Sequence, residues 1–123
     1  MTYTYDPSNI FARILRGEIP NKTVLETPHS LAFHDINPAA PVHVLVIPKG
    51  PYVTFDHFAA EASAEELVDF HRACAQVCAV VGVAPGSGYR AITNVGTDGM
   101  QEVPHFHLHI LGGRLMGRLI ERF

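Results

Sequence analysis

The sequence lacks the features that mark several classes of protein. No apolar run approaches the roughly 20 residues that a helix needs to cross a bilayer. Residues 1–7 contain no basic segment followed by an apolar one, as a secretory signal would. With a net charge of −3, the chain also lacks the basic surface that nucleic-acid binding usually requires. We therefore expect no membrane partner and no nucleic-acid partner.

Cysteine is also scarce. The two cysteines, Cys74 and Cys78, stand one helical turn apart on an apolar face, which predicts buried thiols rather than a disulfide or a metal pair. Free thiols fit a reducing compartment, so the expected location is the cytoplasm. A chain of 123 residues that is 47% hydrophobic can form one domain with a real core. We expect a single domain over residues 1–123, with flexible ends at about 1–7 and 117–123.

Hydrophobic periodicity predicts two helices and about five strands. A short helix over residues 9–16 is capped by Ser8. A long helix begins after Ser63, which forms a capping box with Glu66 and precedes apolar residues at helical spacing. Strands are expected at residues 22–26, 31–34, 42–47, 89–94 and 105–111. Because short turns join most of these strands, the sheet should be antiparallel, and the expected class is α+β with the helices on one side.

Histidine is the residue that this chain has in excess. There are eight, and three of them, His105, His107 and His109, alternate within five residues of the last predicted strand. Side chains on a strand point alternately to its two faces. The three imidazoles should therefore line one open face, while Phe106 and Leu108 between them face the core. Packing alone does not explain three histidines in register.

Two kinds of chemistry fit this pattern. Two histidines at positions i and i+2 of a strand can bind one zinc ion, but His105 and His109 would lie about 13 Å apart along the strand. His43 could supply an outside ligand, yet no carboxylate or cysteine is placed to complete a familiar set, so we predict no metal and no cofactor. Nucleophilic catalysis fits better, because neutral imidazole is a good nucleophile near pH 7. A second imidazole can then contact the phosphoryl oxygens or the leaving group.

The run HFHLHIL at residues 105–111 resembles the signature of the histidine triad superfamily. Three further segments are similar to its Hint branch, the purine nucleoside phosphoramidases. They are Ile10-Phe11 with Glu18-Ile19-Pro20, residues 31–36 leading into 41–48, and residues 94–114. Together the similar segments cover about residues 9–116 in collinear order, which implies the HIT-like fold and a symmetric homodimer.

The resemblance implies a role for each histidine. His107 matches the nucleophile, which attacks the α-phosphorus and forms a nucleotidyl-histidine. His109 matches the residue that contacts the phosphate and the leaving group. His105 matches the first member of the triad, whose backbone helps to orient the nucleophile, and His43 matches a fourth active-site histidine. Asp35 matches the acidic residue that holds the ribose hydroxyls.

The resemblance also implies a pocket for a purine nucleotide. The residues that match the base pocket are Ile10, Phe11, Ile14, Phe33, Ile36 and Leu45. Those that match the wall beside the phosphate are Asn94, Gly99, Gln101 and Glu102. The chain departs from animal Hint proteins at Met100 and Glu102, where those proteins have glycine and serine, and it lacks their tryptophan-proline ending.

The implied function is hydrolysis or transfer at the α-phosphate of purine nucleoside phosphoramidates or acyl-nucleotides, with release of the nucleoside monophosphate. The sequence Gly112-Gly113-Arg114 favours this branch over dinucleoside polyphosphate hydrolysis, the activity of the Fhit branch. Two other functions stay open: a nucleotide-binding interaction module with little activity, and a zinc-binding protein.

Overall fold

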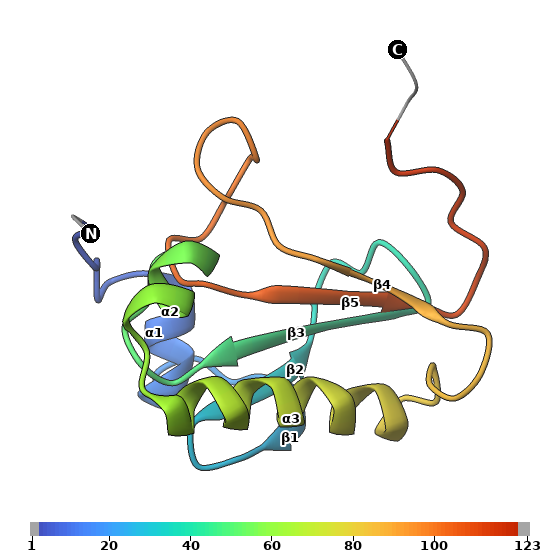
Figure 1. Ribbon diagram of the computed structural model, residues 1–123, viewed down its shortest axis with the longest axis horizontal. Coiled ribbons are helices and arrows are strands. Elements are labelled where there is room, and N and C mark those ends of the chain that lie inside the picture. Colours follow the sequence, from blue (N-terminus) through green and yellow to red (C-terminus); the bar gives the residue numbers. More distant parts are fainter. Residues whose placement is uncertain (1–2, 121–123) are drawn as a thin grey trace.

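Five strands form one antiparallel sheet in the computed structural model, which describes residues 3–120 (Figure 1). They are β1 (Thr23–Glu26), β2 (Ser30–His34), β3 (Val42–Pro48), β4 (Tyr89–Ile92) and β5 (Leu108–Gly112). Their order across the sheet is β1-β2-β3-β5-β4, so the last strand of the chain lies between β3 and β4. The predicted α+β class with five antiparallel strands is confirmed.

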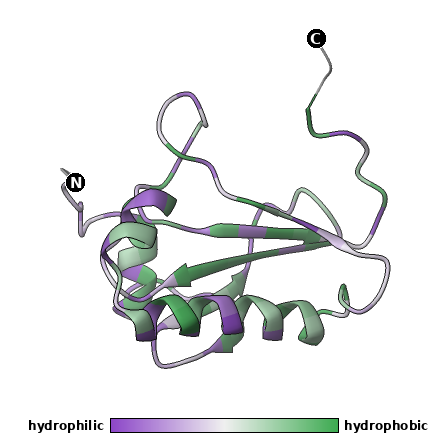
Figure 2. Ribbon diagram, viewed as in Figure 1, coloured by the Kyte–Doolittle hydropathy of each residue, from purple (hydrophilic) through white to green (hydrophobic). Residues whose placement is uncertain are grey.

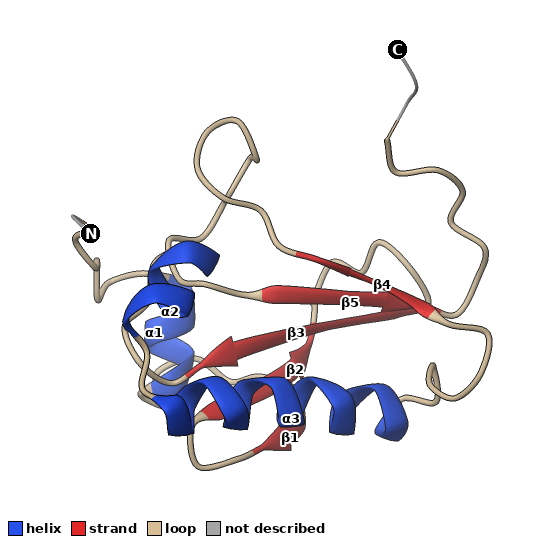
Figure 3. Cartoon of the chain, viewed as in Figure 1, coloured by secondary structure: helices blue, strands red, loops and turns tan. Residues whose placement is uncertain are grey.

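Three helices accompany the sheet (Figure 3). They are α1 (Ile10–Leu15), α2 (Phe55–Glu61) and α3 (Ala64–Val80). The capping box that predicted α3 is present, since the backbone N–H groups of Glu66 and Ser63 each donate to the other residue's side chain. Sequence analysis missed α2, because a helix of seven residues has too few turns to show its periodicity. None of the helices within residues 3–120 is long and apolar enough to cross a membrane.

The two faces of the sheet pack against different helices. Val44 and Ile110 point to one face, where they join residues of α3 in the larger hydrophobic core. Phe33 and Leu45 point to the other face and pack with Phe11 of α1 in a smaller cluster. The helices therefore lie on both sides of the sheet, which corrects the expectation that they share one side. Figure 2 shows that β3 and β5 are mostly hydrophobic, as strands with two covered faces should be.

The last strand begins later than predicted. β5 starts at Leu108 rather than three residues earlier. The backbone just before it bonds outside the sheet ladder: the N–H of Phe106 donates to the carbonyl of Tyr52 at 2.8 Å. The hydroxyl of Thr93 donates to the carbonyl of His107 at 2.9 Å. The first two histidines of the triad therefore lie in a connecting segment that leads into the strand.

The histidine face is also less open than predicted. His105 has 0% of its surface exposed and His107 has 6%. Between them, Phe106 is buried in the larger core, with its ring centroid 5.1 Å from that of Phe58 and 5.0 Å from that of Phe70. The packing of Phe106 in this aromatic cluster fixes the connecting segment, and with it the backbone of the two histidines on either side.

Candidate active site

Strand alternation brings four of the predicted site residues together. His109 of β5 pairs with Leu45 of β3, and His43 lies two residues before Leu45, so both imidazoles point to the α1 face of the sheet. Asp35 follows β2, and its N–H donates to the carbonyl of His43 at 3.0 Å. The Asp35 carboxylate is 3.4 Å from Nε2 of His43. The ring centroids of His107 and His109 are 5.0 Å apart, which completes the group.

The hydrogen bonds of His107 determine which of its nitrogens is free. Its Nδ1 lies 2.7 Å from the carbonyl oxygen of His105. A carbonyl only accepts, so Nδ1 carries the proton and Nε2 carries the lone pair. Nε2 has no hydrogen-bond partner within residues 3–120, and every fully buried side-chain nitrogen or oxygen in that range has one. The lone pair of Nε2 therefore reaches solvent, as a nucleophile must.

A second chain of bonds orients His109. The backbone N–H of Ala39 donates to Nδ1 of His43 at 3.0 Å, so the proton of this ring is on Nε2. That Nε2–H donates in turn to Nδ1 of His109 at 2.9 Å. The proton of His109 is consequently on its own Nε2. His109 thus offers an N–H donor beside the lone pair of His107, an arrangement that can bind a phosphoryl oxygen.

His105 is held by two bonds on opposite sides of its ring. Its Nε2–H donates to the carbonyl of Pro48 at 2.8 Å, and the hydroxyl of Tyr5 lies 2.6 Å from its Nδ1. Since Nδ1 carries no proton in this tautomer, Tyr5 is the donor. Sequence analysis missed Tyr5, because it lies in an irregular segment a hundred positions from the triad.

Burial keeps these imidazoles neutral. It lowers the pKa of His105 and of His109 to about 4 each, and it lowers the pKa of His107 and of His43. For His43 the nearby carboxylate of Asp35 opposes the effect of burial without reversing it. Near pH 7 the site therefore contains neutral rings, so the lone pair of His107 is available.

An apolar cluster adjoins the histidines. Of the residues predicted to form the base pocket, Phe11, Phe33 and Leu45 are buried together, and Ile14 packs against them. The ring of Phe11 stands edge-on to that of His107, with centroids 4.9 Å apart. The other two predicted residues are Ile10, which is 43% exposed, and Ile36, which is 82% exposed. These two isoleucines lie outside the buried cluster, on the protein surface.

The residues predicted to form the wall beside the phosphate lie in or next to a loop that the hydrogen bonds of Gln101 hold in place. The side-chain amide of Gln101 donates to the carbonyls of Val53 and Val103, and its oxygen accepts the N–H of Gly96. Gly99 closes the loop tightly, because a Cβ there would lie 2.5 Å from the carbonyl oxygen of Val95. The other two wall residues are Asn94, which is half-buried, and Glu102, which is exposed and whose charge acts to raise the pKa of His107.

One part of the metal analysis is corrected by the structure. A carboxylate is placed to complete a ligand set, because one ligand atom from each of Asp35, His43 and His109 lies within 4.8 Å of the others. One carboxylate with two imidazoles is a common zinc-binding combination. The remaining triad members, His105 and His107, do not belong to this group. The three residues could hold a divalent metal ion, although Asp35 and His43 already have hydrogen-bond partners without one.

Comparison with known proteins agrees with this geometry. The model of the HIT domain family matches residues 16–116. The chain belongs to the HIT family. An uncharacterized 13.2 kDa HIT-like protein of Azospirillum brasilense is 56% identical over 122 residues, covering 99% of both chains. A 14 kDa zinc-binding protein of Zea mays is 42% identical over 114 residues, covering 90% of this chain and 86% of that one.

Solved structures of the family are also similar. A HIT family hydrolase from Clostridium thermocellum superposes with a TM-score of 0.83 at 41% identity, covering 93% of this chain and 97% of that chain. A histidine triad nucleotide-binding protein from Candida albicans gives a TM-score of 0.75 at 27% identity, covering 93% and 87%. The expected HIT-like fold is therefore confirmed.

The buried histidines predict that the protein loses stability in acid. Their pKa values in the folded protein lie below the usual value of about 6.5. Between about pH 6.5 and about pH 4 the unfolded chain therefore binds more protons than the folded protein, and the free energy of unfolding falls as the pH falls. Urea denaturation at several pH values in this range measures the effect.

Two variants test the source of this dependence. His109→Gln should make it less steep, because one of the titrating groups is gone. His71→Gln, on the exposed side of α3, should leave it unchanged. Equal stability of the wild type at both ends of the range would contradict the assignment of neutral buried rings.

Proposed function

We propose that the chain is a nucleotide hydrolase or transferase that acts on the α-phosphate of purine nucleoside phosphoramidates or acyl-nucleotides. The observation that carries this proposal is the lone pair on Nε2 of His107. It belongs to a neutral ring whose other nitrogen is bonded to the backbone, and it reaches solvent beside His109. The similarity of the sequence to the Hint branch supports the choice of substrate class.

The reaction proceeds in two displacements. The lone pair of His107 Nε2 forms a bond to the α-phosphorus while the bond from phosphorus to the leaving group breaks. An acyl group leaves as a carboxylate, whereas an amine leaves with a proton supplied by water. Water then attacks the phosphorus and releases its proton to solvent. The bond to Nε2 breaks, its electron pair returns to the ring, and the nucleoside monophosphate departs.

Neighbouring residues serve binding and charge stabilisation. The Nε2–H of His109 donates to a phosphoryl oxygen as negative charge develops there. The apolar cluster around Phe11 and Phe33 receives the purine base. Asp35 accepts from the ribose hydroxyls through its half-buried carboxylate. Two comparisons support the proposal: one similar structure is titled a hydrolase and another a nucleotide-binding protein.

His107 should be indispensable for turnover. His107→Asn removes the nucleophile, so turnover of an adenosine phosphoramidate is expected to disappear while nucleotide binding is largely retained. Mass spectrometry of intact wild-type protein after brief exposure to the substrate should detect a covalent nucleotide, which the variant should lack. His71→Asn is the matched control on the exposed side of α3. A rate above a few per cent of wild type in His107→Asn would overturn the nucleophile assignment.

We also propose a symmetric homodimer in which α3 and β4 form the interface. β4 is an edge strand of the sheet. Tyr89 on this strand is exposed, as are Val68 and Val80 on α3. An unpaired edge and exposed apolar side chains are surfaces that a second copy can cover. Light scattering at micromolar concentration should give the mass of two chains, and the mass of one chain would contradict the proposal.

Zinc binding is a second candidate function. The grouping of Asp35, His43 and His109 favours it, as does the name of the Zea mays relative. The two candidates compete for the same residues, since a carboxylate bound to zinc offers less to a ribose. They also differ in what they require, because the phosphoramidase proposal needs no metal.

Asp35→Asn separates the two candidates. If the carboxylate holds the ribose, the change should weaken binding of AMP about 3- to 10-fold more than binding of dAMP, as loss of a hydrogen bond would. Wild-type turnover should persist in EDTA. Asp98→Asn, in an exposed loop, is the control and should change neither affinity. Turnover that is lost in EDTA and restored by zinc would instead favour the metal candidate.

A further inference from the structure

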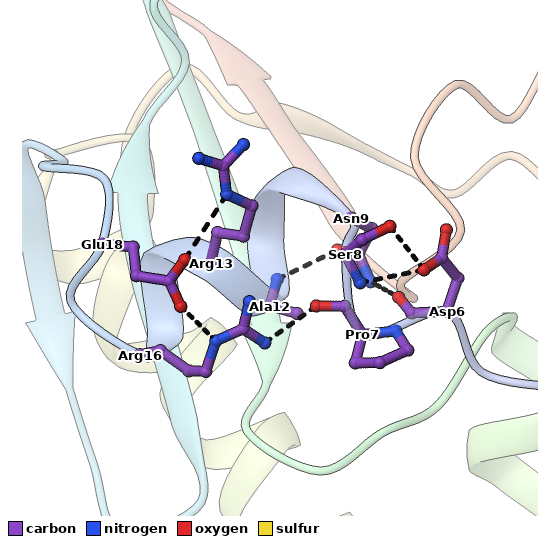
Figure 4. A network of polar contacts seen from close by, with 8 residues as sticks. All are labelled: Asp6, Pro7, Ser8, Asn9, Ala12, Arg13, Arg16 and Glu18. Atoms are coloured by element: carbon purple, nitrogen blue, oxygen red, sulfur yellow. Dashed lines mark hydrogen bonds and ion pairs between the residues drawn. The ribbon is translucent and has the colours of Figure 1, made fainter.

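The residues before α1 fold into a hydrogen-bonded turn (Figure 4). The carboxylate of Asp6 accepts from both the N–H and the hydroxyl of Ser8, at 2.9 Å and 2.6 Å. The side-chain amide of Asn9 donates to the carbonyl of Asp6 at 2.7 Å. The oxygen of the same amide caps α1 by accepting the N–H of Ala12 at 2.9 Å, so the N-cap is Asn9 and not Ser8 as predicted. The turn is thus joined to the first turn of the helix.

The other end of α1 reaches back to the same segment. Arg16 donates through Nη1 to the carbonyl of Pro7 at 2.8 Å. Its Nε contacts the carboxylate of Glu18, which also lies near Arg13 (Figure 4). Residues 6–9 are therefore fixed to both ends of α1. Asp6 and Pro7 fall within the end that sequence analysis expected to be flexible, of which residues 1–2 lie outside the described part.

This turn places Tyr5 against the triad. Its hydroxyl is 2.6 Å from Nδ1 of His105, and its ring stands edge-on to the imidazole with centroids 5.5 Å apart. The nearby Tyr3 takes a different partner, because its hydroxyl donates to Asp56 of α2 at 2.7 Å. Of the two tyrosines, Tyr5 is the one that contacts the active site.

We propose that Tyr5 is a positioning residue for the nucleophile His107 and acts through His105. This inference rests on the proposed function for its catalytic consequence, although the structural link exists without it. The link has three steps: the first two are made by hydrogen bonds and the third by aromatic packing.

First, Tyr5 and Pro48 form hydrogen bonds to the two nitrogens of the His105 ring. Pro48 accepts from Nε2–H, and Tyr5 donates to Nδ1, so both ring nitrogens are satisfied in a residue with no exposed surface. Loss of the Tyr5 hydroxyl would leave Nδ1 without a partner inside the protein. A buried nitrogen in that state costs free energy, so the ring would shift or admit water.

Second, the position of the His105 ring is coupled to its own carbonyl. That carbonyl accepts the Nδ1–H of His107 at 2.7 Å, and this bond directs the lone pair of Nε2. Third, the segment that carries Tyr5 also leads into α1, whose Phe11 packs edge-on against the His107 ring. Residues 5–9 therefore support the nucleophile along two routes, one through His105 and one through Phe11.

Tyr5→Phe tests the hydroxyl alone, since it keeps the ring that packs on His105. In nitrogen-15 NMR of the free protein, the Nδ1 resonance of His105 should move toward that of an imidazole without a donor, and the Nδ1–H resonance of His107 should move as well. With an adenosine phosphoramidate, kcat should fall about 3- to 10-fold while KM changes less than about 2-fold. If Tyr5 had only a structural role, Tyr5→Phe would lower stability without lowering kcat selectively over KM.

Tyr3→Phe is the matched control. It also removes a tyrosine hydroxyl from the N-terminal segment, but the bond that it breaks is to Asp56 and not to His105. It should leave the histidine resonances and kcat unchanged. The proposal is overturned if Tyr5→Phe leaves the His107 resonance and kcat at their wild-type values. If the wild type turns over no nucleotide substrate, the proposed function fails, and the His107 resonance alone decides whether Tyr5 positions that ring.

Discussion

The candidate active site depends on one hydrogen bond, from Nδ1–H of His107 to the carbonyl of His105 at 2.7 Å. A side chain that bonds to the backbone two residues earlier pulls the chain out of the extended form and takes that carbonyl away from the sheet ladder. This bond therefore contributes to the late start of β5 at Leu108, together with the bonds that Tyr52 and Thr93 make to the same segment. The bond can persist because Phe106, between the two histidines, is buried in the core. Core packing therefore determines the direction of the lone pair on Nε2 of His107.

The burial of this segment also keeps the histidines neutral. Charged rings would be costly in so buried a site, whereas neutral rings need only a correct tautomer. Backbone groups select three of the four tautomers: the N–H of Ala39 for His43, the carbonyl of Pro48 for His105, and the carbonyl of His105 for His107. The His43 ring then selects the tautomer of His109. The folded main chain moves less than side chains do, so the pattern of donors and acceptors is set before any ligand binds.

The features that sequence analysis predicted are those that follow from local patterns. Alternation and turn spacing were enough for the antiparallel sheet, and the capping box at Ser63 was enough for α3. The late start of β5 was not predictable, since it depends on Thr93 and Tyr52, which are remote in sequence. The contact of Tyr5 with the triad and the approach of the Asp35 carboxylate to two histidines were missed for the same reason.

Register is what places the chemistry on one face of the sheet. Leu31 and Phe33 of β2 pair with Ile47 and Leu45 of β3, and the next positions on that face are Asp35 and His43. The face thus changes from apolar residues under α1 to polar residues beyond it. A slip of β3 by one residue would turn His43 into the core under α3 and bring Val44 into the site. Because Val44 and Val46 are fully buried against α3, such a slip would also break the larger core. The packing that stabilises the fold therefore also selects the register in which the histidines and Asp35 meet.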